Sequence, residues 1–112
     1  MKPYSRELLK GTADTLVLSA FAEGEKYGYQ VVKELESRSD GFFQFKEGTL
    51  YPILHRLERQ GWLQARWESM PNGMERRYYV LTTAGRQTLN ERITEWTGFA
   101  QAVGRVTAGI GA

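Results

Sequence analysis

The spacing of apolar residues changes once along this chain, at Gly61, and this change restricts the fold more than any other feature. Before Gly61, apolar residues recur every three or four positions, which is the period of an amphipathic helix. After it, residues 62–69 and 75–82 are rich in aromatic and β-branched residues with the alternation of strands. The sequence therefore predicts helices followed by a β-hairpin.

Three helices are expected before Gly61. They cover residues 11–25 (GTADTLVLSAFAEGE), 27–39 (YGYQVVKELESRS) and 47–61 (EGTLYPILHRLERQG), and glycines 24 and 61 end the first and third. Residues 5–10, with Leu8 and Leu9, are expected to form a lead-in turn, and most of Phe42, Phe43 and Phe45 to fill the junction before the third helix. The expected core positions are Ala13, Leu16, Val17, Ala20 and Phe21, then Tyr29, Val32 and Leu35, then Leu50, Ile53, Leu54 and Leu57.

The hairpin turn is predicted at MPNGM, residues 70–74. Pro71, Asn72 and Gly73 fit a type I turn that a left-handed glycine closes. The residues around this turn, SMPNGME, form a short and almost uncharged tip.

A long last helix is predicted from Thr82 or Thr83 to about Ala108. At a rise of about 1.5 Å per residue it would be roughly 39 Å long, which is too long for so small a domain to cover. Its apolar positions are spaced alternately by four and three residues, and this heptad seam indicates a partner helix from a second copy of the chain. The seam positions, expected to form the dimer interface, are Leu89, Ile93, Trp96, Ala100 and Val103, and the pattern continues to Thr107 and Ile110.

Two short helices, a third helix and a hairpin follow the order of a winged helix-turn-helix, in which the third helix enters the DNA major groove. The predicted fold class is mainly α with a small β-hairpin (α+β). Residues 1–82 are expected to form the DNA-binding domain and residues 83–112 the dimerisation helix of the same compact unit.

Composition agrees with a single domain of 112 residues and excludes several classes of protein. The chain contains no cysteine and one histidine, His55, and it has no His/Asp/Glu grouping with metal-ligand spacing. We therefore expect no enzyme, no metal and no cofactor. No run of apolar residues is long enough to span a membrane, and the segment MKPYSRELLKG does not resemble a signal peptide, so we expect a cytoplasmic protein.

The net charge of +2 is small, but its distribution points to an anionic partner. Residues 42–82 carry six Lys/Arg against four Asp/Glu, and this segment contains the third helix. On a helical wheel, the four apolar residues of that helix fall on one side. The opposite side carries Gly48, Pro52, His55 and Arg59, with Thr49, Tyr51 and Arg56 toward its edges.

Gly48 and Pro52 are the residue types that a helix interior tolerates least. They would let the first turns approach base edges or a phosphate closely, while His55, Arg56 and Arg59 reach phosphates or a guanine edge and the Tyr51 hydroxyl reaches a phosphate. The alternative is that Gly48 and Pro52 only shape the start of the helix and that the arginines are a solvated face. If Lys46 is the N-cap, Pro52 lies in the second turn, where a slight kink is expected.

These segments together resemble the PadR family of transcriptional regulators. The similarity is carried by GTLYPILHRLERQGWL (48–63) and RRYYVLTTAG (76–85), with GYQVVKELE (28–36) and LVLSAFAEG (16–24) upstream. It covers the chain from about Ser5 to the final helix, and the length is similar to that of the short subfamily with one C-terminal helix.

The resemblance implies a homodimeric DNA-binding repressor. We expect its two recognition helices to read an inverted-repeat operator in double-stranded DNA. The resemblance also implies that residues 48–52 open the recognition helix and that Arg76 and Arg77 are the basic positions of the wing. The wing tip SMPNGME is short and almost uncharged, so deep insertion into a DNA minor groove is not expected. Arg66 and Arg76 are expected instead to clamp phosphates near the base of the wing.

Some members of that family bind flat aromatic effectors at the dimer interface, so Trp96 is a candidate effector contact. The alternative is that Trp96 simply packs against its mate. Gly98 weakens the same helix, and either a close helix approach or a widened cavity would explain it.

One further alternative is a winged helix used only for protein–protein contact, without DNA binding. The basic outer side of the third helix, rich in small residues, argues against it. The two functions differ in their response to salt, because DNA binding weakens steeply between about 50 and 200 mM.

Overall fold

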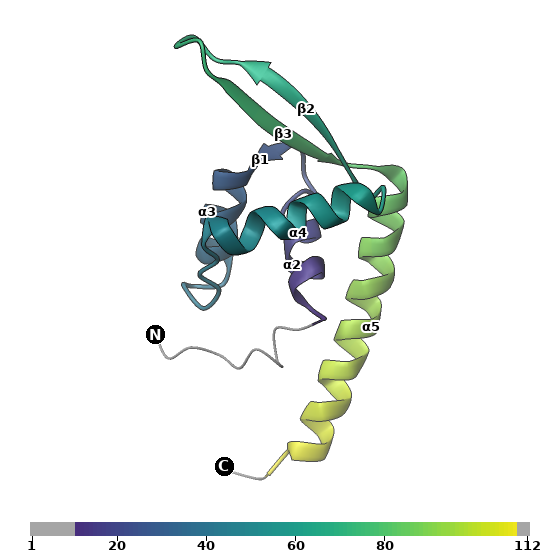
Figure 1. The fold of residues 1–112 in the computed structure, drawn as a ribbon. Coiled ribbons are helices and arrows are strands. Elements are labelled where there is room, and N and C mark those ends of the chain that lie inside the picture. Colours follow the sequence, from purple (N-terminus) through teal and green to yellow (C-terminus); the bar gives the residue numbers. More distant parts are fainter. Residues whose placement is uncertain (1–10, 110–112) are drawn as a thin grey trace.

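The computed structural model describes residues 11–109, in which a helical body carries a projecting hairpin and a long C-terminal helix (Figure 1). The order of elements confirms the predicted α+β winged helix-turn-helix with a long last helix. The elements are α2 (Ala13–Ser19), β1 (Lys26–Tyr27), α3 (Gly28–Arg38), α4 (Glu47–Arg59), β2 (Leu63–Ser69), β3 (Glu75–Leu81) and α5 (Thr83–Thr107). The predictions for Leu8, Leu9 and Ile110 lie outside the described residues.

The described sheet has three antiparallel strands in the order β1-β3-β2, one strand more than the predicted hairpin. In the added pairing, Lys26 lies opposite Tyr79 and Tyr27 opposite Tyr78. A strand of two residues has no alternation of its own, so the spacing of apolar residues could not indicate it.

The hairpin turn forms as predicted. Gly73 has a left-handed backbone with φ +85° and donates its N–H to the Met70 carbonyl at 2.9 Å. The Met70 N–H in turn bonds to the Met74 carbonyl at 2.7 Å, and Asn72 Oδ1 accepts the Met74 N–H at 3.0 Å. We call the β2–β3 hairpin, residues 63–81, the wing.

The core lies between α2, α3, α4 and the sheet. The apolar stripe of α4 is buried as predicted, with Leu50, Leu54 and Leu57 fully enclosed. In the first helix the predicted positions Val17, Ala20 and Phe21 are buried, but regular helix stops at Ser19 and the chain reaches Gly24 through tight turns. The core is completed by Leu18, Val31, Leu35, Phe45, Ile53, Leu63, Tyr79 and Leu89.

The prediction of which side of α3 is buried is wrong for the first turn of the helix. Tyr29 is 47% exposed, and the buried residues are Gly28, Val31 and Leu35, because the residue-28 side of the helix faces α4. The phenylalanine cluster is buried in part: Phe45 is enclosed, Phe43 is half-buried, and Phe42 is exposed with its ring edge against Phe43.

The start of α5 is fastened to the corner between α4 and β2. Thr82 is the N-cap: its Oγ1 accepts the Gly85 N–H at 2.9 Å and donates to the Gly61 carbonyl at 2.7 Å. The Thr82 N–H donates to the Trp62 carbonyl at 3.1 Å. The helix passes so close that a Cβ on Gly85 would collide with the Trp62 carbonyl oxygen.

Leu89, the first position of the predicted dimer seam, is only 2% exposed and belongs to the core of the protomer. The first turns of α5 pack against α2, and this contact buries Leu89. The exposed part of the seam therefore begins at Ile93.

Candidate nucleic-acid interface

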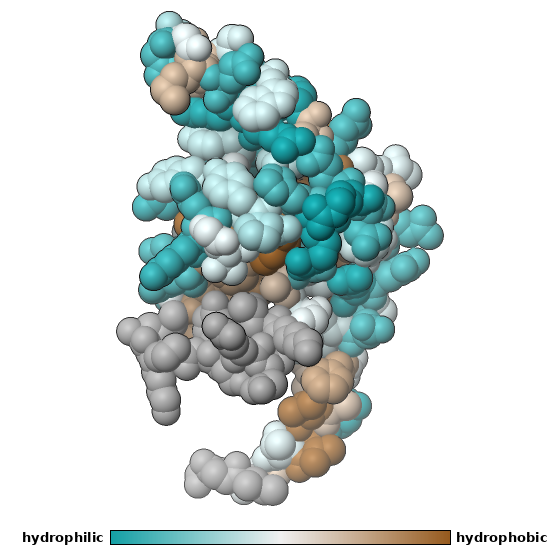
Figure 2. Space-filling model, viewed as in Figure 1, coloured by the Kyte–Doolittle hydropathy of each residue, from teal (hydrophilic) through white to brown (hydrophobic). Residues whose placement is uncertain are grey.

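The outer side of α4 presents side chains that the core does not use. Figure 2 shows hydrophilic side chains across the part of the molecule where Figure 1 places α4. We call this side the recognition face. All its members are exposed: Gly48, Thr49, Tyr51, Pro52, His55, Arg56 and Arg59.

Gly48 and Pro52 leave the first turns of this face open. A Cβ built on Gly48 would meet no heavy atom within 4 Å. Pro52 lies inside the continuous helix and has no N–H, so the Gly48 carbonyl loses the bond that residue 52 would donate.

Tyr51 is held against the N-terminus of α3. A Cβ on Gly28 would lie 2.7 Å from the Tyr51 hydroxyl oxygen and 2.8–2.9 Å from its ring carbons. Partial burial, with the nearby Glu47 charge, raises the pKa of Tyr51 above its ordinary value. The hydroxyl therefore stays a hydrogen-bond donor well beyond neutral pH.

The two arginines of the recognition face differ in their partners. Arg56 forms an ion pair with Asp14 in the first turn of α2. The side chains of Arg59 and His55 have no hydrogen bond or ion pair within residues 11–109. Of the two arginines, Arg59 is thus the more available cation of this face.

Arg77 lies on the side of the wing turned toward α4. Its Nη2 donates to both carboxylate oxygens of Glu58, at 2.7 and 2.9 Å. The predicted wing contact is therefore occupied by a carboxylate of α4 itself.

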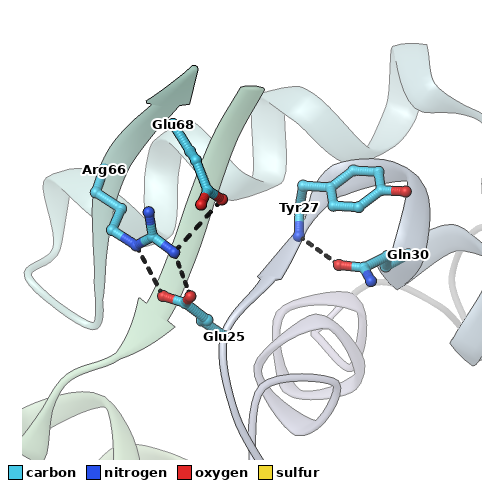
Figure 3. A network of polar contacts seen from close by, with 5 residues as sticks. All are labelled: Glu25, Tyr27, Gln30, Arg66 and Glu68. Carbon is cyan, nitrogen blue, oxygen red and sulfur yellow. Dashed lines mark hydrogen bonds and ion pairs between the residues drawn. The ribbon is translucent and has the colours of Figure 1, made fainter. Parts of the chain in front are cut away.

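Arg66 and Arg76 lie on the opposite side of the wing. Arg66 Nε donates to Glu25 at 3.0 Å, and its Nη2 contacts Glu25 and, at 3.7 Å, Glu68 (Figure 3). The hydrogen bonds from Arg66 lower the pKa of the Glu25 carboxyl group. Two carboxylates thus compete with any phosphate for Arg66.

Arg76 stacks on an aromatic ring. Its guanidinium carbon lies 4.1 Å from the centre of the Tyr27 ring, which meets Tyr78 edge-on at 5.5 Å. The Tyr27 N–H is bound by Gln30 Oε1 at 3.0 Å, which fixes the start of α3 beside this stack (Figure 3). In the described part of the chain Arg76 has no carboxylate partner, so its charge is available at the base of the wing.

The fold and this arrangement can be compared with known proteins. Residues 17–91 match the model of the transcriptional regulator PadR-like family, which is well over half of the chain. The chain belongs to the PadR-like family. The predicted family is thereby confirmed, and with it the expectation of a transcriptional regulator rather than an enzyme.

Similar proteins support the assignment of this PadR-like chain to a family of transcriptional regulators. A PadR-family transcriptional regulator from Eggerthella lenta is 35% identical with a TM-score of 0.79, over 92% of this chain and 88% of that one. Transcriptional regulator Rv3488 of Mycobacterium tuberculosis is 35% identical over 86 residues, 77% of each chain. Bacillus subtilis PadR in complex with operator DNA has a TM-score of 0.68 at 24% identity, over 73% of this chain and 47% of that chain.

The far part of α5 in this PadR-like chain carries an exposed apolar stripe, visible as brown surface on its lower half in Figure 2. Trp96 is 49% exposed and its ring lies 6.0 Å from that of Phe99. The heptad pattern missed Phe99 and Val106, because both fall beside its strict positions. The large apolar members of the stripe are Ile93, Trp96, Phe99, Val103 and Val106, and Ala100 is also exposed.

Two structural findings concern other kinds of site. Among residues 11–109 no group of histidine and carboxylate side chains is arranged to hold a metal ion. No helix in the same range is both long and apolar enough to cross a membrane.

Several residues that shape the interface were missed from the sequence. Asp14, Glu25 and Glu58 bind three of the arginines that were predicted to contact DNA. Two of these pairs join residues about forty positions apart, so no local pattern could indicate them. For Gly28 the sequence does offer a signal of close packing, because a glycine stands at the start of an otherwise regular helix.

Proposed function

We propose that this chain is a homodimeric DNA-binding repressor that recognises an inverted-repeat operator through α4. The observation that carries the proposal is the division of α4: all four large apolar residues are buried, while the recognition face is exposed and combines small residues with hydrogen-bond donors. This is what a helix needs to approach base edges without disturbing its own domain. The operator complex of the Bacillus subtilis relative supports the same use of the fold.

The individual roles follow from the partners of each side chain. Arg59 and His55 reach phosphates or a guanine edge, and Gly48, Thr49 and Pro52 allow close approach of the backbone. Tyr51 donates its hydroxyl to a phosphate from a position that Gly28 fixes. Arg76 binds a phosphate near the base of the wing, whereas Arg56 and Arg66 must first leave their carboxylates.

Dimerisation is supported by the apolar stripe of α5. Contiguous large apolar side chains are costly to leave in water, and a second copy of the same helix covers them most simply. In the proposed dimer, two copies of α4 bind half-sites about 34–36 Å apart, one helical turn of DNA.

Relief of repression by a small aromatic effector is the last part of the proposal. Trp96 lies near the middle of the stripe and offers a flat surface on which a planar molecule can stack. A ligand there would change the crossing of the α5 helices and spoil the half-site spacing without touching DNA contacts. If Trp96 only packs against its mate, Trp96→Ala will leave the response to such a ligand unchanged.

Footprinting of the purified protein on DNA around its own gene tests binding, symmetry and spacing together. We expect two protected half-sites related by a two-fold axis, and an affinity that falls steeply between about 50 and 200 mM salt. Absence of binding to any DNA at low salt would favour the alternative, a winged helix used only for protein contact.

A further inference from the structure

The wing needs support where it leaves the body. Strand β1 pairs only with Tyr78 and Tyr79, so from Arg77 outward the wing is a ribbon of two strands. Figure 1 shows this ribbon projecting beyond the helices. Isolated two-stranded ribbons are marginally stable and strongly twisted, so the direction of the wing must be set at its base.

Arg77 and Glu58 join the wing to the recognition helix at this point. Glu58 lies in the last turn of α4, and Arg77 is the first residue of β3 outside the three-stranded part of the sheet. The side chains are 30% and 31% exposed, and one guanidinium nitrogen, Nη2, bonds to both carboxylate oxygens. A partly buried, charge-assisted contact of this kind holds its two elements in one geometry.

Two aromatic rings lie beside the Arg77 guanidinium. Its central carbon lies 5.6 Å from the ring centre of Trp67, the cross-strand neighbour, and 5.4 Å from that of Tyr79. Its Nε is buried and has no hydrogen-bond partner among the described residues. The group is therefore oriented toward α4 rather than toward a phosphate in solvent.

We propose that the Glu58–Arg77 pair, with Trp67 beside Arg77, is a positioning device that sets the angle between the wing and the recognition helix. Arg77 thus acts through the wing and does not bind DNA itself. The pair allows one bound DNA segment to meet both α4 and the wing. This inference rests on the proposed DNA-binding function.

The substitution Glu58→Gln distinguishes a positioning role of Arg77 from direct DNA contact, because the two roles predict opposite changes in operator affinity. If Arg77 bound a phosphate, Glu58→Gln would release it and tighten operator binding. If the pair positions the wing, Glu58→Gln and Arg77→Ala will each weaken operator binding about fivefold, and the double variant will be no weaker than Arg77→Ala alone. The matched control is Glu36→Gln on α3, which removes the same charge from an exposed side chain and corrects for general attraction to DNA.

Hydrogen exchange of the DNA-free protein provides a readout independent of operator binding. In Glu58→Gln, amides of the outer wing, residues 69–75, should exchange about tenfold faster, while those of Leu54 and Leu57 keep their wild-type rates. Tighter DNA binding by Glu58→Gln, or unchanged exchange in the wing, would overturn the proposal. If the wild-type protein bound no DNA, the proposed function would fail, and the exchange rates would still decide whether the pair holds the wing.

Discussion

The ring of Tyr51 occupies the space that a side chain at residue 28 would need. A Cβ on Gly28 would lie within 2.7–2.9 Å of three atoms of Tyr51, a separation that real Cβ atoms do not show. The glycine at the start of α3 therefore fixes a residue of the recognition face. Neither residue suggests this relationship from its own segment of sequence.

Gly28→Ala should displace Tyr51 and weaken operator binding about as much as Tyr51→Ala does. The free energy of unfolding should fall by about 1–2 kcal/mol, since the ring must leave its site. In a double-mutant cycle Tyr51→Ala makes room for the new methyl group, so the two effects on operator binding should not add. Additive losses would show that Gly28 and Tyr51 act independently.

Asp14→Asn and Arg59→Ala should change operator affinity in opposite directions. Arg59→Ala removes an available cation and should lower affinity at least tenfold, a loss typical of one phosphate or guanine contact. Asp14→Asn releases Arg56 from its ion pair and should raise affinity about threefold. Titrations of labelled operator at fixed salt measure both.

Glu36→Gln serves as the charge-matched control for Asp14→Asn. An equal gain from the control would show that net charge alone matters and that Arg56 does not reach DNA. Sedimentation of each variant should give the wild-type molecular mass, because none of these residues lies on the stripe of α5.

The sequence predicted the division of α4 because that information is local. Within the thirteen residues of α4, the helical period alone places Leu50, Leu54 and Leu57 on the buried side and Arg59 on the exposed side. The partners of the arginines were not predictable in this way. Asp14 meets Arg56 only because α2 packs against α4, a tertiary contact without a local signature. Similarly, Leu89 fits the heptad of α5, yet it packs into the body because α2 covers it.

Two glycines of α5 should respond oppositely to alanine. In Gly85→Ala the new methyl group would meet the Trp62 carbonyl, a backbone group that cannot rotate away, so we expect a loss of at least about 3 kcal/mol. Nothing lies within 4 Å of a Cβ on Gly98, so Gly98→Ala should stabilise the helix by about 0.5–1 kcal/mol. Urea unfolding of both variants gives these values. Equal stability of the two variants would contradict the close contact at Gly85.

Alkaline pH should destabilise the protein through Tyr79. Burial of its hydroxyl raises the pKa of Tyr79 above the ordinary value of 10.0, so the unfolded chain loses this proton before the folded chain does. The contribution of Tyr79 is therefore fully present below about pH 10 and is lost as the pH rises through the folded pKa. Thermal unfolding between about pH 8 and 11 should show a shallower decline for Tyr79→Phe than for wild type.

A single negative charge on the α5 stripe should separate the proposed dimer. Phe99 is 62% exposed in the protomer, so Phe99→Glu leaves the fold of one chain intact but would bury an unpaired carboxylate between two copies. The dimer dissociation constant should rise at least about a hundredfold, which corresponds to about 2.7 kcal/mol.

Gln101→Glu introduces the same charge on an exposed position of the same helix and should leave the dimer unchanged. Sedimentation equilibrium measures both constants, and footprinting of Phe99→Glu should show that the two half-sites fill independently. A Phe99→Glu protein that remained dimeric would mean that the copies associate through another surface, and the stripe would then require a different partner.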